Sequence, residues 1–157
     1  MDGVLVNWNG GVERLLGMPI EKVLEQYPDK QDRYGRIVAK DPDFYQNLEW
    51  LPEGKRLWEY LQPLHPALLT AYSRYVPRGA ELKRSWALRE LGLPAERVFA
   101  YMNKWEKKGH AVNRDGSPNV LIDDEPNNIE EWREAGGIGI LHTGVDETVV
   151  ELRKLGL

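Results

Sequence analysis

Short apolar runs alternate with helical patterns along most of the chain, and this alternation constrains the fold more than any other feature. Four runs have the length and composition of buried strands: ALLTAYS, RVFAYM, NVLID and GIGILH, residues 67–73, 97–102, 119–123 and 137–142. Segments with helical spacing of apolar residues separate them. Strands joined by helices pair in parallel through right-handed crossovers, so the sequence predicts an α/β fold with a Rossmann-like open parallel sheet.

The helix after the third run has the clearest local signal. Asn128 is followed three residues later by Glu131, which resembles a capping box, and a pair of glycines closes the segment. This pattern predicts a helix over residues 128–136. Further helices are predicted over residues 53–62, 79–92 and 146–156.

Residues from about 10 to 50 follow a different pattern. GVERLLG and PIEKVLEQY resemble short helices, whereas the next stretch, residues 27–47, is polar, aromatic and rich in turn residues without a clear strand. We interpret residues 10–50 as a small helical cap inserted above the sheet. A chain of 157 residues suits a single domain, so we expect residues 1–157 to form one domain with this insertion.

Composition excludes several classes of protein. The net charge of −4 gives no electrostatic footprint for nucleic acid or a membrane surface, and no stretch has the roughly 20 apolar residues of a membrane span. There is no cysteine, so disulfides and thiolate metal sites are ruled out. The N-terminus lacks the basic and apolar regions of a signal peptide. We therefore expect a cytoplasmic protein without a nucleic-acid or membrane partner.

Polar side chains follow the predicted strands at the points where those strands end. Thr70 ends the first run, Lys104 follows the second, and Asp123 and Asp124 end the third, while Asp2 would end a strand if one preceded it. Ligands of open parallel sheets bind at this edge. Adjacent carboxylates favour Mg²⁺, and a lysine and a hydroxyl beside the cation suit a phosphoryl group. The pattern predicts phosphoryl transfer.

In this order the motifs resemble the haloacid dehalogenase superfamily of phosphohydrolases, and more narrowly its 5′(3′)-deoxyribonucleotidase-like branch. MDGVL, residues 1–5, matches the first motif of that family, Asp-x-Asp-Gly-Val-Leu, apart from its first aspartate. LLTA, residues 68–71, matches the second motif, and Lys104 matches the third. VLIDDEP, residues 120–126, matches the fourth. The resemblance covers nearly the whole chain.

The resemblance implies a role for each matching residue. Asp2 would be the acid and base and would give its carbonyl to Mg²⁺, and Asp123 and Asp124 would complete the metal site. Thr70 and Lys104 would hold the phosphate oxygens, with Lys107 and Lys108 as rivals for the lysine. The nucleophilic aspartate, which would form an aspartyl-phosphate, would stand directly before Met1 and end a central strand.

Three explanations of the first motif remain open. The true start lies upstream of Met1, or the chain is naturally truncated and inactive, with Val4–Val6 as a makeshift strand, or the match is coincidental. We expect an upstream start, because a sheet without its central strand would leave backbone groups unpaired on both neighbouring strands.

Simpler structural interpretations stand beside the functional ones. Asp123 and Asp124 could form a turn before a helix, and KWEKKGH, residues 104–110, is expected to be a solvated loop. Lys83 is expected on a solvated helix face, although the resemblance to the family's Lys-x-x-Trp leaves a role in the site open. In the family, aromatic residues where the cap returns to the core can stack on a base. The predicted substrate-binding residues are Thr70, Ala71, Lys104, Phe44, Tyr45 and Trp50, although for the three aromatic residues packing of the cap on the core is the favoured role.

The sequence thus predicts a magnesium-dependent phosphomonoesterase acting on a nucleoside monophosphate or a similar small phosphate ester. An inactive relative that binds a phosphate ligand or a protein partner is the alternative. The phosphatase part of a nucleic-acid end-processing enzyme is a third option, which the acidic composition opposes.

Overall fold

The four predicted strand segments form four short parallel strands. The computed structural model describes residues 1–157. The strands are β1 (Leu68–Ala71), β2 (Val98–Tyr101), β3 (Val120–Asp123) and β4 (Ile138–Leu141).

The strands form two separate sheets of two strands each rather than one continuous sheet. β1 pairs with β2, and β3 pairs with β4, both in parallel. The parallel α/β class is therefore confirmed, whereas a single open sheet is not observed. No ladder of hydrogen bonds joins β1 to β3, because residues 3–5 form a turn and the neighbouring Asp2 and Val6 make only isolated bridges. The makeshift strand considered for Val4–Val6 is absent.

Apolar layers nevertheless unite the two sheets. Side chains alternate across a strand, so Leu68 and Ile122 lie toward the larger hydrophobic cluster, and Leu69 and Leu121 toward a smaller one. The smaller cluster also contains Trp132. Helices thus cover both faces of the strand pairs, as a buried parallel sheet requires.

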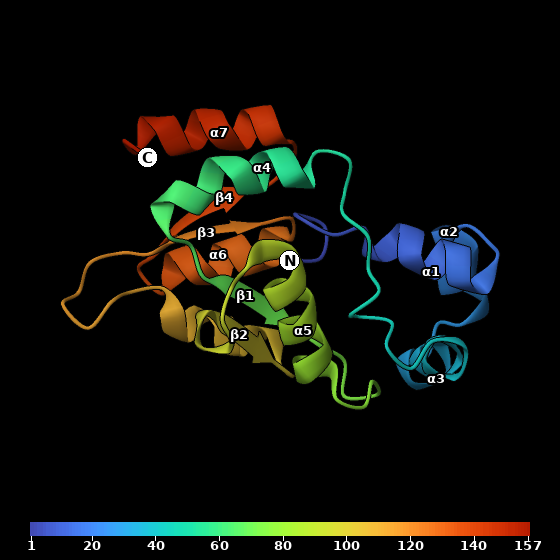
Figure 1. Cartoon of the computed structure of the whole chain (residues 1–157). Coiled ribbons are helices and arrows are strands. Elements are labelled where there is room, and N and C mark those ends of the chain that lie inside the picture. The colour runs from blue at the N-terminus through green and yellow to red at the C-terminus, as the bar shows by residue number, and fades with distance from the viewer.

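Helices surround the strands on the body and form a lobe at one side. In Figure 1, α4 and α7 pack together along one edge of the body, while α1, α2 and α3 lie apart from the strands. The helices are α1 (Trp8–Leu16), α2 (Ile20–Gln26), α3 (Lys30–Lys40), α4 (Gly54–Leu61), α5 (Gly79–Leu91), α6 (Pro126–Glu134) and α7 (Val145–Lys154), with 3₁₀ turns η1 (Gln62–Leu64), η2 (Ala95–Arg97) and η3 (Lys104–His110).

Two helices differ from the sequence-based expectations. α6 begins at Pro126, a favoured residue for a first helical turn, and the predicted capping box is absent because Asn128 donates to Asp123 instead. α3 was not predicted, since its residues are mostly polar. Its start is fixed by Asp29, whose carboxylate accepts from the Asp32 amide at 2.9 Å.

The helical lobe occupies the part of the chain that we interpreted as a cap. Val12, Val23 and Ile37 are buried, one on each helix, and belong to the larger hydrophobic cluster together with core residues of the body. Shared apolar contacts therefore hold the lobe to the body. Its role as a cap over a site stays a prediction.

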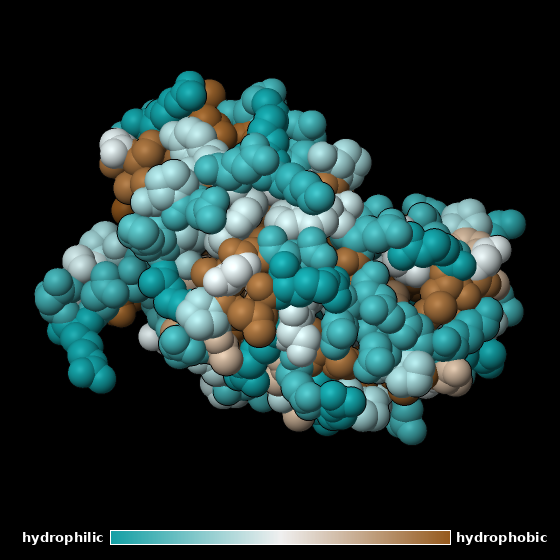
Figure 2. Space-filling model, in the orientation of Figure 1, coloured by the Kyte–Doolittle hydropathy of each residue, from teal (hydrophilic) through white to brown (hydrophobic).

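The surface gives no sign of a membrane segment. No helix is both long and apolar enough to cross a membrane. On the face shown in Figure 2, hydrophilic residues cover most of the molecule, and hydrophobic residues come to the surface in separate small patches.

Trp86 is the largest fully buried side chain, and its loss should destabilise the fold severely. Its Nε1 donates to the Leu48 carbonyl at 2.8 Å, and its ring lies 5.1 Å from that of Trp50. We expect Trp86→Ala to lower the free energy of unfolding by about 3–5 kcal/mol in urea titrations followed by circular dichroism. The matched control is Trp105→Ala, at a ring that is 60% exposed, with an expected change within about 0.5 kcal/mol. Equal losses would contradict the assigned packing.

His110 should make stability depend on pH. Burial lowers the pKa of His110 from its ordinary 6.5, and its Nε2 lies 2.6 Å from the Tyr101 hydroxyl. The folded protein therefore binds fewer protons than the unfolded chain as the pH falls through about 6.5, so acid favours unfolding. We expect the stability advantage of the wild type over His110→Gln to shrink between about pH 7.5 and about pH 5 in urea titrations. An advantage that grows over this range would contradict the assignment.

Candidate active site

A cavity of about 1000 Å³ lies at the carboxyl ends of the strands. Its walls come from the N-terminal turn, the start of α3, the loop after β1, η3 and the end of β3. Predicted site residues from widely separated parts of the chain meet there: Asp2, Tyr45, Thr70, Ala71, Lys104, Asp123 and Asp124 all line this cavity.

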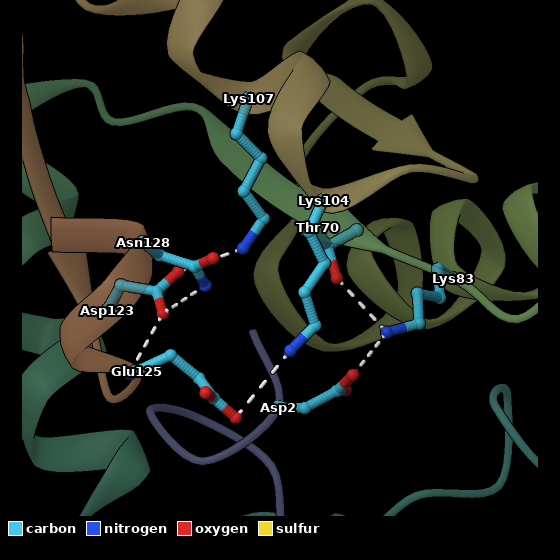
Figure 3. Close-up of polar contacts among 8 residues, drawn as sticks. All are labelled: Asp2, Thr70, Lys83, Lys104, Lys107, Asp123, Glu125 and Asn128. Atoms are coloured by element: carbon cyan, nitrogen blue, oxygen red, sulfur yellow. Dashed lines mark hydrogen bonds and ion pairs between the residues drawn. The ribbon is translucent and has the colours of Figure 1, made fainter. Parts of the chain in front are cut away.

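A buried ion pair closes the floor of the cavity. The Lys83 ammonium donates to Asp2 Oδ2 at 2.5 Å and to Thr70 Oγ1 at 3.0 Å (Figure 3). Lys83 is 0% exposed and also lies over the ring of Tyr45, 4.6 Å from its centroid. Burial lowers the pKa of Lys83, and the Asp2 carboxylate acts in the opposite direction. One cation thus connects the N-terminal turn, β1 and α5.

The position of Lys83 corrects the expectation of a solvated helix face. Lys83 lies three residues before Trp86 and four before Ala87, and both are buried on α5. These spacings place the three side chains on the same face of the helix. The spacing was visible in the sequence and could have identified Lys83 as an inward-facing residue.

Asp123 is held by donors on both of its oxygens. Oδ2 accepts from Lys107 Nζ at 2.9 Å, and Oδ1 accepts from the Glu125 amide at 3.0 Å and from Asn128 Nδ2 at 2.7 Å. Burial acts to raise the pKa of Asp123, but the Lys107 charge and these hydrogen bonds outweigh it and lower that pKa. Asp123 is therefore a fixed anion at the end of β3.

The adjacent Asp124 has a different environment. Its carboxylate opens to the cavity and lies against Gly3, where a Cβ atom would come within 1.9 Å of Asp124 Oδ2. Gly3 also has a positive φ of 70°, a conformation that favours glycine. Both the lack of space for a Cβ atom and the backbone conformation therefore favour glycine at this position. Partial desolvation and then the Asp123 charge raise the pKa of Asp124. Asp124 makes no side-chain hydrogen bond to the rest of the chain.

Of the three lysines of η3, Lys107 is buried, whereas Lys104 and Lys108 are exposed. Lys104 lines the cavity, but its side chain is 59% exposed and its ammonium lies 3.6 Å from Glu125. Lys107 is buried and lines the same cavity. Residues 104–110 form a 3₁₀ helix, so the expectation of a solvated loop was wrong. Lys107, which the sequence analysis considered as an alternative to Lys104, is better placed than Lys104 to contact a phosphate group in the cavity.

Two of the three predicted aromatic residues lie outside the cavity. Phe44 is buried in the larger hydrophobic cluster, and Trp50 packs on Trp86 while its Nε1 donates to Glu90 at 2.7 Å. These two residues pack the segment after the lobe onto the body, which was the alternative interpretation. Tyr45 does line the cavity, and its hydroxyl accepts from the Ser73 amide at 3.0 Å. Aromatic residues that sequence reasoning missed also line it: Trp8, Tyr34, Tyr72, Tyr75 and Trp105.

Some of the carboxylate oxygens that line the cavity could coordinate a divalent cation. No three His, Asp or Glu side chains converge as a ready metal cluster. Asp2 Oδ1, however, is buried without a partner, and Asp124 is free of hydrogen bonds within the protein. Mg²⁺ keeps several waters and commonly uses one or two carboxylates together with substrate phosphate. Asp2 and Asp124 fit that requirement, whereas Asp123 is occupied by Lys107 and Asn128.

Comparison with known proteins reveals similarity in structure but not in sequence. The sequence matches no known family profile and no curated protein. The structure is similar to that of a hydrolase from Streptococcus pneumoniae TIGR4, with a TM-score of 0.54 and 15% sequence identity over 99% of this chain and 94% of the other. The two chains therefore share an overall fold.

Removal of the buried ammonium should leave Asp2 without its donor. We expect Lys83→Met to destabilise the protein by about 2–3 kcal/mol, since a third of the Asp2 side chain remains open to water. Asp2→Asn combined with Lys83→Met should recover about 1 kcal/mol or more of this loss. Urea titration of the four proteins of this double-mutant cycle measures the effect, and Lys108→Met, at an exposed lysine, is the control. Strictly additive losses would contradict a direct interaction.

Proposed function

We propose that the protein is a magnesium-dependent phosphomonoesterase acting on a nucleoside monophosphate or a similar small phosphate ester. One observation carries the proposal: Asp2 and Thr70 share the Lys83 ammonium at the floor of a cavity that the carboxylates of Asp123 and Asp124 also line. A hydroxyl, a potential proton donor and an anionic strand end are thereby brought together from three segments of the chain. The shared fold with a hydrolase is consistent with this function.

The proposed reaction has two steps. A carboxylate on a residue directly preceding Met1 attacks phosphorus, the bond from phosphorus to the alcohol oxygen breaks, and Asp2 gives that oxygen a proton. Asp2 then takes a proton from water as the water oxygen attacks phosphorus. This second attack releases inorganic phosphate and restores the carboxylate nucleophile.

The remaining residues bind and orient the phosphoryl group. Thr70 accepts from Lys83, so its own hydroxyl proton is free to donate to a phosphate oxygen. Lys107, paired with Asp123, lies at the wall formed by η3, where its ammonium can donate further hydrogen bonds to a phosphate oxygen. Mg²⁺, held by the backbone carbonyl of Asp2 and the carboxylate of Asp124, would neutralise charge on the phosphoryl oxygens.

The cavity walls support a substrate with a flat organic group. Trp8, Tyr34, Tyr45 and Trp105 come from different segments of the chain and line the same cavity. Aromatic rings stack on bases and contribute about 1–3 kcal/mol per base in other proteins. Trp105, being largely exposed, is the most accessible of these rings.

A catalytically inactive binding protein is the second candidate. Its support is that Asp2 and Asp123, two of the acidic residues assigned to chemistry, are each engaged by a lysine within the protein. Such ion pairs would suit a fixed phosphate-binding pocket as well as a reacting one.

Activity of the protein isolated from its natural source tests the proposal. The intact mass of this protein should exceed 18.1 kDa by at least the mass of a strand that ends in aspartate. The protein should also release p-nitrophenol from p-nitrophenyl phosphate when Mg²⁺ is present. Asp2→Asn should lower kcat by at least about 100-fold because the proton donor is lost. The control Asp115→Asn, at an exposed carboxylate outside the cavity, should leave kcat unchanged.

The two candidates predict different outcomes. A natural protein with a carboxylate before Met1 that hydrolyses no phosphate ester would contradict the enzyme and favour the binding protein. A natural protein that begins at Met1, with a mass of 18.1 kDa, would likewise remove the proposed nucleophile.

A further inference from the structure

Near the strand ends, the two lysines that line the cavity are paired within the protein. Lys107 Nζ lies 2.9 Å from Asp123, and Lys104 Nζ lies 3.6 Å from Glu125. Their charges are therefore largely balanced before any ligand binds.

Arg33 on α3 is a cation of a different kind. It lines the same cavity and is only 7% exposed, yet no carboxylate pairs with it. Its Nη1 donates to the Tyr27 carbonyl at 2.7 Å and more weakly to the Pro28 carbonyl at 3.4 Å, while its Nε is buried without a partner. The carboxylate of Asp29, on the same wall, instead caps the start of α3.

A buried guanidinium without a counter-ion is costly, since desolvation of a charge is offset only by pairing and hydrogen bonds. Two backbone carbonyls fix the position of the Arg33 group without neutralising it. A planar guanidinium held in this way is suited to receive a carboxylate or a phosphate. Lys30 and Arg74 line the same cavity, and neither forms an ion pair within the protein.

Tyr34, which follows Arg33 on α3, and Asp2 at the floor line the same cavity as Arg33. The proposed reaction centre and the Arg33 group thus face one continuous cavity.

We propose that Arg33, assisted by Lys30 and Arg74, binds a second anionic group of the substrate, a phosphate or a carboxylate remote from the ester that reacts. The proposal rests on the phosphomonoesterase function proposed above and selects, among its small phosphate esters, those that carry a further negative charge, which a simple nucleoside monophosphate lacks. The helical lobe then contributes directly to substrate selection through α3.

Calorimetric titration without Mg²⁺ tests this second subsite, because binding is then measured independently of turnover. The probes are ribose 5-phosphate, with one anionic group, and ribose 1,5-bisphosphate, with two. We expect the wild type to bind the bisphosphate at least about tenfold more tightly than the monophosphate. Arg33→Met should reduce this advantage to about twofold or less and leave monophosphate binding nearly unchanged.

Arg36→Met is the matched control. Arg36 is on the same helix, pairs with Asp32 on the surface and does not line the cavity, so its loss changes the net charge equally. It should preserve the bisphosphate advantage. If Arg33→Met does not fold, Arg33→Lys, which keeps the charge but loses the planar fork, should give an intermediate advantage.

Equal binding of the two probes by the wild type would overturn the subsite, as would an unchanged advantage in Arg33→Met. These failures differ from failure of the proposed function. Turnover of simple monoesters without a bisphosphate advantage would remove the subsite alone. A bisphosphate advantage without turnover of any ester would leave an anion-binding pocket and remove the enzyme.

Discussion

The buried ammonium of Lys83 organises the floor of the cavity. Its contacts with Asp2 and Thr70 join the N-terminal turn to the end of β1, and its stem anchors both to α5. The two strand pairs share no ladder of hydrogen bonds, and the two apolar layers pack them together. The same ion pair fixes the orientation of the carboxylate to which we assign proton transfer.

Charge is distributed unevenly around the cavity. At the strand ends each of three lysines has a carboxylate partner, and Asp124 adds a carboxylate without a partner. On the side of the helical lobe, Arg33 is buried and has no acidic partner. Under the proposed function, this asymmetry would orient an anionic substrate with one end toward the hydroxyl of Thr70 and the other toward α3. A ligand with a single charge would leave the Arg33 guanidinium without a counter-ion.

Local patterns were sufficient to predict the strands and the residues at their ends, because period and position along a parallel strand decide which side chains reach one edge. Thr70, Asp123 and Asp124 therefore reach the cavity as expected. The split sheet, the burial of Lys83 and the helix from Lys30 to Lys40 were not predicted. Each depends on tertiary partners, and a polar helix such as α3 is stabilised by its few buried side chains and its cap rather than by propensity.

The central claim is that the cavity floor around Asp2 and Thr70 receives a phosphoryl group. A crystal structure of the protein with inorganic phosphate measures this most directly. The account predicts a phosphate ion within hydrogen-bonding distance of Thr70 Oγ1, with Lys83 still bound to Asp2. Phosphate bound elsewhere, with the hydroxyl of Thr70 left without an anion at saturating concentration, would contradict it.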